Sequence, residues 1–210
     1  MKKFKKIKYL LAAIFMLSMG NVTLSVDNIL VAYFSYGENA LLPADVDASA
    51  SASIQFWDNQ LTGNTGVVAH MINDAVDGDL FSIITAEKYP ASYDETVNIG
   101  RSERNSNARP ELISHIENLD KYDTIFIGFP NWWSDMPMAL YSFLDEYDFS
   151  GKTIIPFSTS GGSGLSDAAN SIREAEPNAE VLNGFTISAR RSVNAENEVL
   201  RQLRNLDLID

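Results

Sequence analysis

Five short runs of aliphatic, β-branched and aromatic residues recur along the chain, and stretches with helical spacing separate them. The runs read ILVAYFS (29–35), DLFSIIT (79–85), YDTIFIGF (122–129), KTIIPFS (152–158) and AEVLNGFTIS (179–188). Helical spacing covers residues 65–76, 110–119, 138–147, 166–174 and 195–206. Runs that are apolar throughout are typical of strands buried on both faces of a parallel sheet. The alternation predicts a three-layer α/β fold, with an open parallel five-stranded sheet between two layers of helices.

Ligands of open parallel sheets bind beyond the carboxyl ends of the strands. One candidate segment, TGNT at residues 62–65, begins a stretch with helical spacing. The amides of a helix start, together with the hydroxyls of Thr62 and Thr65, favour an anion. Because the lysine-containing motif of nucleotide triphosphate sites is absent, the expected anion is a phosphate monoester. An ordinary helix cap would use the same residues.

Two further segments directly follow predicted strands. FPNWWSDMPM (129–138) contains adjacent tryptophans, whose size and indole N–H groups call for a partner that a planar aromatic ligand would supply. STSGGSG (158–164) combines glycines and hydroxyls, which allow a ligand to approach the backbone closely. The alternatives are a tryptophan packed on a neighbouring loop and a flexible connection. If the strands are parallel, all three segments lie at one edge of the sheet.

The order of these segments resembles that of the flavodoxin-like family over the whole chain after its first residues. The resemblance rests on VAYFS, TGNTGVVAHMI, YPASYDETV, FIGFPNWWSDMPMALYSFL and FSTSGGSGL. It implies the strand order 2-1-3-4-5 and FMN as the cofactor. The family pattern places the phosphate at the first segment, a stacking aromatic ring in the second, and the third at the polar edge of the flavin.

The resemblance also implies which residues bind the cofactor. The phosphate would be held by Ser35, Thr62, Gly63, Asn64 and Thr65. Trp133 is expected to stack on the flavin, with Pro130, Asn131 and Trp132 beside it. The pyrimidine side of the flavin would face Ser158, Thr159, Ser160, Gly161, Gly162 and Ser163.

Two features depart from the family pattern. The serine and the TGNT motif adjoin in the family, whereas residues 36–61 separate them here, so an insertion splits the phosphate loop. The entropic cost of closing such an excursion grows only slowly with its length, which permits the arrangement. Ser134 stands where relatives often carry glycine, and a side chain there makes a positive φ costly.

The first 25 residues form a separate unit. A lysine-rich stretch (2–8) precedes an apolar run (9–19) that ends in small or polar residues. This layout is typical of a secretory signal peptide, and the run is shorter than the roughly 20 residues that span a bilayer. We therefore expect a signal peptide at 1–25 and an exported FMN-binding domain at 26–210, with membrane contact only through an uncleaved leader.

Charge and cysteine content restrict the function further. The formal net charge of −12 makes nucleic acid an unexpected partner. The chain has no cysteine, which excludes thiol catalysis, iron–sulfur clusters and thiolate zinc sites.

Two functions remain open on this fold. The first is an FMN-binding electron-transfer protein that serves an unidentified redox partner protein. The alternative is an NAD(P)H-dependent FMN quinone reductase. Arg101, Arg104 and Arg109 could grip a nucleotide phosphate, although a solvated charged face explains them as well.

Overall fold

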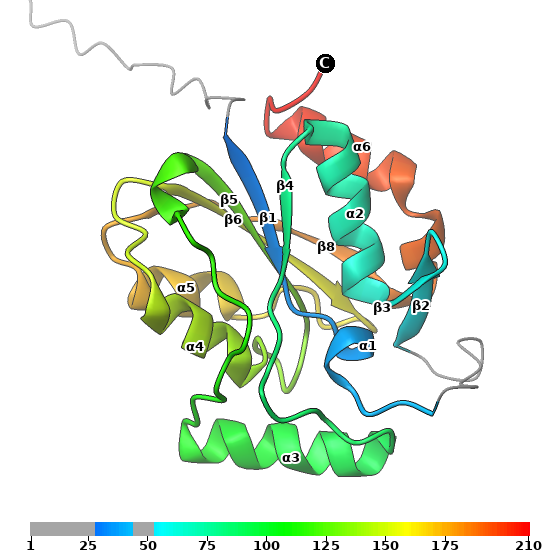
Figure 1. Cartoon of the computed structure of the whole chain (residues 1–210). Helices are drawn as coiled ribbons and strands as arrows, with labels where there is room; N and C mark the ends of the chain where they lie inside the picture. The colour runs from blue at the N-terminus through cyan, green and yellow to red at the C-terminus, as the bar shows by residue number, and fades with distance from the viewer. Residues whose placement is uncertain (1–27, 44–52) are drawn as a thin grey trace, which may run out of the picture.

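The computed structural model describes residues 28–43 and 53–210 (Figure 1). The predicted signal peptide (1–25) and the middle of the insertion (44–52) lie outside the described residues. Within the part that is described, no helix is long and apolar enough to cross a membrane.

A single parallel sheet forms the centre of the molecule. Its strands are β1 (Ile29–Tyr33), β4 (Asp79–Ser82), β5 (Thr124–Pro130), β6 (Thr153–Ser160), β7 (Glu180–Val181) and β8 (Phe185–Ser188). The order is β4-β1-β5-β6-β7, with β8 also paired to β6, and every pairing is parallel. The predicted fold and the order 2-1-3-4-5 are therefore confirmed.

The fifth predicted strand forms as two pieces, β7 and β8, which both pair with β6. Between them Gly184 has a φ of 66°. A Cβ at this position would lie 2.0 Å from the carbonyl oxygen of Pro156. The chain therefore leaves the sheet at a glycine that approaches β6 too closely for any side chain.

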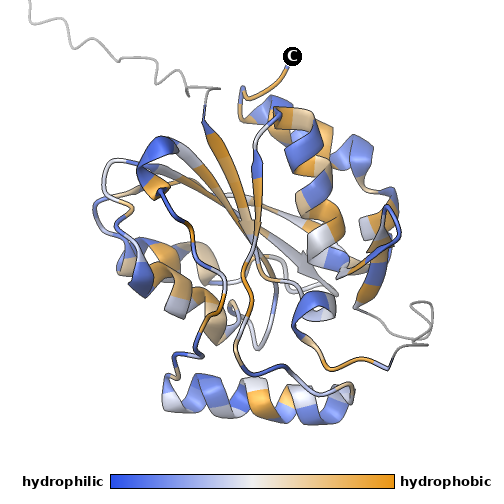
Figure 2. Ribbon diagram, in the orientation of Figure 1, coloured by the Kyte–Doolittle hydropathy of each residue, from blue (hydrophilic) through white to orange (hydrophobic). Residues whose placement is uncertain are grey.

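Two hydrophobic clusters lie on opposite faces of the sheet. Helices α2 (Asn64–Val76) and α6 (Glu196–Asn205) cover one face, and α4 (Met138–Glu146) and α5 (Ala168–Ala175) cover the other. Alternate residues of β1 belong to different clusters, Leu30 to the α4 side and Val31 to the α2 side. Hydrophobic residues fill β1 and alternate with hydrophilic ones along α2 and α4 (Figure 2). These two clusters make the three-layer architecture.

The insertion forms a short helix and a hairpin beside α2. The helix α1 (Tyr36–Asn39) follows β1, and β2 (Ile54–Trp57) pairs antiparallel with β3 (Gln60–Gly63). Trp57 stacks on His70 of α2, with ring centroids 5.4 Å apart and an interplanar angle of 14°. The returning end of the insertion is thereby fixed to the helix that it precedes.

Helix α3 (Tyr93–Ser106) lies across the end of the molecule toward which the strands point (Figure 1). The predicted helix at 110–119 is wrong. There the chain is extended, since Leu112 forms a β-bridge with Thr85 and the Ile113 N–H donates to the carbonyl of Ile84 (2.9 Å). A 3-10 turn (Leu119–Lys121) then leads into β5.

Candidate cofactor site

Three segments meet at the carboxyl edge of the sheet, where hydrogen bonds join them. The hydroxyls of Thr65, in the first turn of α2, and Thr159, near the end of β6, lie 2.8 Å apart. The backbone N–H of Asn131, directly after β5, donates to the carbonyl of Thr159 (2.9 Å). The side-chain amide of Asn131 donates to the carbonyl of Gly164 (3.0 Å). Residues from the three donor-rich segments therefore form one contiguous site.

The first segment contains a buried hydroxyl without a partner. Ser35, two residues after β1, is 1% exposed, and its Oγ has no hydrogen-bond partner within the described ranges. A Cβ on Gly63 would lie 2.4 Å from this Oγ, so the close approach requires glycine. Gly63 is also the N-cap of α2, whose first turn contains no acidic residue. An unpaired donor beside a helix N-terminus fits an anion such as a phosphate.

Two other side chains of this segment are engaged with protein groups. Thr62 donates its hydroxyl to Oε1 of Glu38 (2.5 Å). Oδ1 of Asn64 accepts hydrogen bonds from Gln55 (3.0 Å) and Ser192 (2.8 Å). Both residues lie in the loop, as expected, but these contacts show their side chains building it. What the segment offers to an anion is the unpaired serine hydroxyl and the amides of the helix start.

The helix α1 closes the split loop, and the sequence does not predict this role. A Cβ on Gly37 would come within 1.8 Å of the carbonyl oxygen of Thr62, so α1 and β3 are in backbone contact. Asn39 is fully buried; it donates to the carbonyl of Ser35 (3.0 Å) and accepts the backbone N–H of Thr85 (2.8 Å). The available signal is the motif G-E-N, a glycine and two polar residues shortly after the first strand.

The second segment contains a tight turn at residues 132–135. Trp132 and Asp135 exchange both backbone hydrogen bonds (2.9 and 3.0 Å), and between them Trp133 (φ 56°) and Ser134 (φ 63°) are left-handed. For residues with a Cβ this conformation costs about 1 kcal/mol or more each. Ser134 therefore adopts a positive φ, a conformation that glycine adopts at a lower cost. Such strain persists where the surrounding structure holds it, and it clusters at ligand sites.

The two tryptophans have different surroundings. Trp132 is half-buried and lies edge-on to Phe34 and Tyr89, with ring centroids 5.6 and 5.2 Å away. Trp133 is 37% exposed, and the guanidinium carbon of Arg101 lies 4.3 Å from the centroid of its ring. Trp132 therefore packs against the core, whereas Trp133 has an aromatic surface that a ligand can reach.

The third segment is held in shape by its own serines. Ser158 donates its hydroxyl to the carbonyl of Gly164 (3.1 Å), and Oγ of Ser160 accepts the Gly164 N–H (2.9 Å). Both serines are buried, so their hydroxyls shape the loop. Residues 161–163 are exposed, and a Cβ on Gly161 or Gly162 would meet nothing within 4 Å. The open part of this segment is therefore 161–163.

Charged groups reach the site from neighbouring elements. Lys88 donates to the backbone carbonyl of Glu38 (2.8 Å), and burial lowers the pKa of Lys88. Tyr33 donates its hydroxyl to Oε1 of Glu38 (2.8 Å). Burial, and then the charge of Glu38, raises the pKa of Tyr33 far above its ordinary value, so this phenol remains a donor. The three segments themselves contribute neutral donors only.

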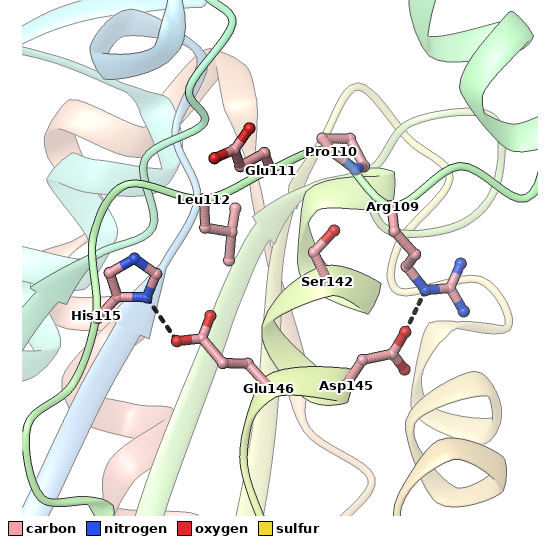
Figure 3. Close-up of a pocket in the computed structure, with 8 residues that line it drawn as sticks. All are labelled: Arg109, Pro110, Glu111, Leu112, His115, Ser142, Asp145 and Glu146. Atoms are coloured by element: carbon pink, nitrogen blue, oxygen red, sulfur yellow. Dashed lines mark hydrogen bonds and ion pairs between the residues drawn. The ribbon is translucent and has the colours of Figure 1, made fainter.

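A separate hollow of about 400 Å³ lies between the connection that follows α3 and the C-terminal half of α4 (Figure 3). An ion pair between Arg109 Nε and Asp145 (2.5 Å) and a hydrogen bond between His115 Nδ1 and Glu146 (2.6 Å) line it. None of the predicted cofactor-binding residues lines this hollow. The hollow is therefore distinct from the candidate cofactor site. Arg109 pairs with Asp145 in the hollow and does not belong to the cofactor site.

Glu176, at the C-terminal end of α5, gives stability a pH dependence. Burial, followed by the charges of Asp148 and Asp145, raises the pKa of Glu176 to about 7. Between its ordinary value of 4.5 and 7 the folded chain binds more protons than the unfolded chain, so stability falls as pH rises.

We therefore expect Glu176→Gln to be more stable than the wild type at pH 8 and equally stable at pH 4. Because the side chain is partly exposed, solvent screening limits the gain to on the order of 1 kcal/mol. Thermal unfolding at both pH values measures it. An equal gain at both would contradict the titration of Glu176.

An open parallel sheet in this order, with donor-rich loops at its carboxyl edge, defines the flavodoxin-like fold. A family model described as flavodoxin matches residues 56–203. The chain belongs to this family.

Solved structures share the fold over most of their length. A protein of Bacteroides uniformis described as a flavoprotein is 29% identical, with a TM-score of 0.63, and the match covers 85% of this chain and 98% of that one. A counterpart from Bacteroides eggerthii is 27% identical, with a TM-score of 0.65 and coverage of 85% and 96%. A flavoprotein from Lactobacillus acidophilus, solved in complex with FMN, is 19% identical, with a TM-score of 0.57 and coverage of 81% and 99%. No curated protein sequence matches the chain.

Proposed function

We propose that this chain is an FMN-binding electron-transfer protein. The observation that carries the proposal is the buried, unpaired hydroxyl of Ser35 beside Gly63 and the N-terminus of α2. An unpaired buried donor is costly unless a ligand completes it. The FMN bound by the Lactobacillus acidophilus relative supports the choice of cofactor.

Three groups of residues would bind three parts of FMN. Ser35 and the amides of the α2 N-terminus hold the phosphate, the exposed ring of Trp133 orients the isoalloxazine, and residues 161–163 line its polar edge. Bound FMN supplies the redox chemistry. The protein supplies position and a neutral set of donors.

Reconstitution tests this proposal directly. The domain 26–210 is purified, and its tryptophan and flavin fluorescence are followed during titration with FMN, FAD and riboflavin. We expect saturable uptake of one FMN with a visible flavin spectrum, and weaker binding of riboflavin, which lacks the phosphate. A folded domain that takes up none of the three would overturn the assignment.

Ser35→Ala is expected to weaken FMN binding roughly tenfold, the loss of about one hydrogen bond to a charged group. Stability should stay within about 0.5 kcal/mol of the wild type, because this hydroxyl has no hydrogen-bond partner among the residues that the structure describes. Flavin titration and denaturant unfolding measure the two quantities.

Ser158→Ala is the matched control for Ser35→Ala. Ser158 donates to Gly164 and lies 2.9 Å from the hydroxyl of Thr186. Its removal should lower stability while leaving the ratio of FMN to riboflavin affinity near the wild-type value. If Ser35→Ala were destabilising and left FMN affinity unchanged, the phosphate role of Ser35 would be wrong.

A second candidate function is an NAD(P)H-dependent FMN quinone reductase. Arg101 and Arg104 are both exposed on α3, and Arg101 lies over the ring of Trp133. Exposed guanidinium groups beside the flavin-binding edge suit the phosphates of a nicotinamide nucleotide. Steady NAD(P)H oxidation by the reconstituted protein with a quinone as acceptor would favour this function. Its absence would favour an electron carrier with a protein redox partner.

We further propose that the chain is exported. The lysine-rich stretch and apolar run at its N-terminus support a signal peptide. Mass spectrometry of the protein recovered from a secreting host should give a mass without the first 20 to 25 residues. Recovery of the full-length chain in the cytoplasm would contradict export.

A further inference from the structure

Glu38 lies where both ends of the insertion meet the sheet. Its carboxylate accepts hydroxyl hydrogen bonds from Tyr33 (2.8 Å), Thr62 (2.5 Å) and Ser82. These donors come from three elements: Tyr33 ends β1, Thr62 belongs to β3, and Ser82 ends β4. One half-buried carboxylate therefore joins the first strand, the neighbouring strand and the hairpin that leads into α2.

The carboxylate lies beside the first turn of α2. A Cβ on Gly66 would lie 1.8 Å from Oγ1 of Thr62 and 3.1 Å from Oε1 of Glu38. The helix start is thus packed directly against the pair formed by Glu38 and Thr62. A shift of this pair would move the amides of the helix start relative to Ser35.

Among the described residues, three hydroxyl donors hold this carboxylate and no cation forms an ion pair with it. The ammonium of Lys88 bonds to the backbone carbonyl of Glu38, so it anchors α1 without pairing with the carboxylate. The hydroxyl of Thr62 is directed to Glu38 and is thereby withdrawn from the anion site. Ser35 Oγ, in contrast, is buried and has no hydrogen-bond partner in the part of the chain that the structure describes.

We propose that Glu38 is the positioning residue of the phosphate site, because its carboxylate binds Thr62 and aligns the N-terminus of α2 with the hydroxyl of Ser35. This inference rests on the proposed phosphate-binding function. It assigns the insertion a role, which is to supply the acceptor that reassembles the split loop. It also removes the Thr62 side chain from the set of direct phosphate ligands.

The test compares FMN with riboflavin, because the ratio of their affinities isolates the phosphate contribution. In Glu38→Ala we expect this ratio to fall about tenfold while the riboflavin dissociation constant stays unchanged. Glu38→Gln keeps an acceptor oxygen in place, so it should restore most of the ratio. Glu38→Met fills a similar volume but has no acceptor oxygen, so it should keep the ratio as low as Glu38→Ala does. A ratio restored by Glu38→Met as well would show that the side chain only fills space and would overturn the proposal.

Lys88→Met is the matched control. It removes a hydrogen bond to the same residue but leaves the carboxylate and its three donors intact. We expect the FMN to riboflavin ratio to be that of the wild type. An equal fall of the ratio in Lys88→Met and Glu38→Ala would show general loosening of α1 and overturn the proposal.

A double-mutant cycle separates the two roles of Thr62. If Thr62 acts through Glu38, adding Thr62→Val to Glu38→Ala should lower the ratio no further, since residues of one network are not additive. If the Thr62 hydroxyl bound the phosphate itself, the two losses would multiply. That outcome would overturn the proposal.

Inorganic phosphate provides a readout without flavin. Phosphate should raise the melting temperature of the wild-type domain, and Glu38→Ala should need about tenfold more phosphate for the same rise. A wild type that phosphate stabilises more strongly than Glu38→Ala, but that takes up no flavin, would overturn the FMN assignment and leave the role of Glu38 supported. A wild type that responds to neither probe overturns both.

Discussion

Replacing Trp132 by alanine is expected to lower the free energy of unfolding by about 3 kcal/mol. Its ring lies edge-on to Phe34 and Tyr89 at 5.6 and 5.2 Å, and such pairs add about 0.5–1.5 kcal/mol beyond burial. A Cβ on Gly100 would lie 3.2 Å from the Trp132 ring, so the indole also supports α3. Guanidinium unfolding followed by circular dichroism measures the loss.

Trp132→Phe is the control for this substitution. A phenyl ring keeps most of the edge-on packing, so we expect it to lose about 1 kcal/mol. Wild-type stability of Trp132→Ala would contradict the packing of this side chain against the core.

The central strands β1 and β5 are predictable because they are buried on both faces, so nearly all of their residues are apolar. Every residue of β1 is buried, and β5 is buried from Thr124 to Phe129. The last strand is less clear in the sequence, since β7 and β8 are short and partly exposed. The position of the break between them depends on the contact of Gly184 with β6. This tertiary contact cannot be predicted from the residues next to Gly184 in the sequence.

Helix α3 is not predictable from apolar spacing, because only Thr96 and Gly100 are buried in it. Its ends favour the helix instead. Ser92 caps its N-terminus by accepting the Glu95 N–H, and Arg104 lies in its last turn. Residues 110–119 are the opposite case, because they have helical apolar spacing but form an extended segment. The spacing of apolar residues therefore predicts a helix wrongly where an extended connection packs its side chains against the core.

The positions of the candidate site residues follow from topology, whereas their partners do not. Parallel strands bring Thr65, Asn131 and Thr159 to one edge, which the sequence predicts. The sequence cannot tell that Thr62 bonds to Glu38, because the insertion separates the two along the chain. Contacts across a split loop depend on tertiary packing, so Glu38 emerges only from the structure.

Trp133→Ala is expected to weaken FMN binding roughly 10-fold to 100-fold, because one stacking contact with an aromatic ring is worth about 1–3 kcal/mol. The indole is held in place before a ligand arrives. Its N–H donates to the carbonyl of Val97 (3.3 Å), and Arg101 lies over the ring at 4.3 Å. With 37% of the side chain exposed, aromatic surface remains for a second ring. Quenching of flavin fluorescence measures the dissociation constant.

Trp57→Ala is the matched control, since Trp57 lies outside the three loop segments and its ring stacks on His70 of α2. Because this ring packs on α2 and not on the turn that carries Trp133, we expect the FMN dissociation constant to change less than about twofold. The two flavins distinguish the roles of Trp133 and Ser35. Trp133→Ala should weaken the binding of riboflavin as much as the binding of FMN, because stacking involves the isoalloxazine ring alone. Ser35→Ala should instead weaken the binding of FMN selectively. If Trp133→Ala left both flavins unaffected, the flavin would have to contact another side chain, and the left-handed turn at 132–135 would need a different explanation.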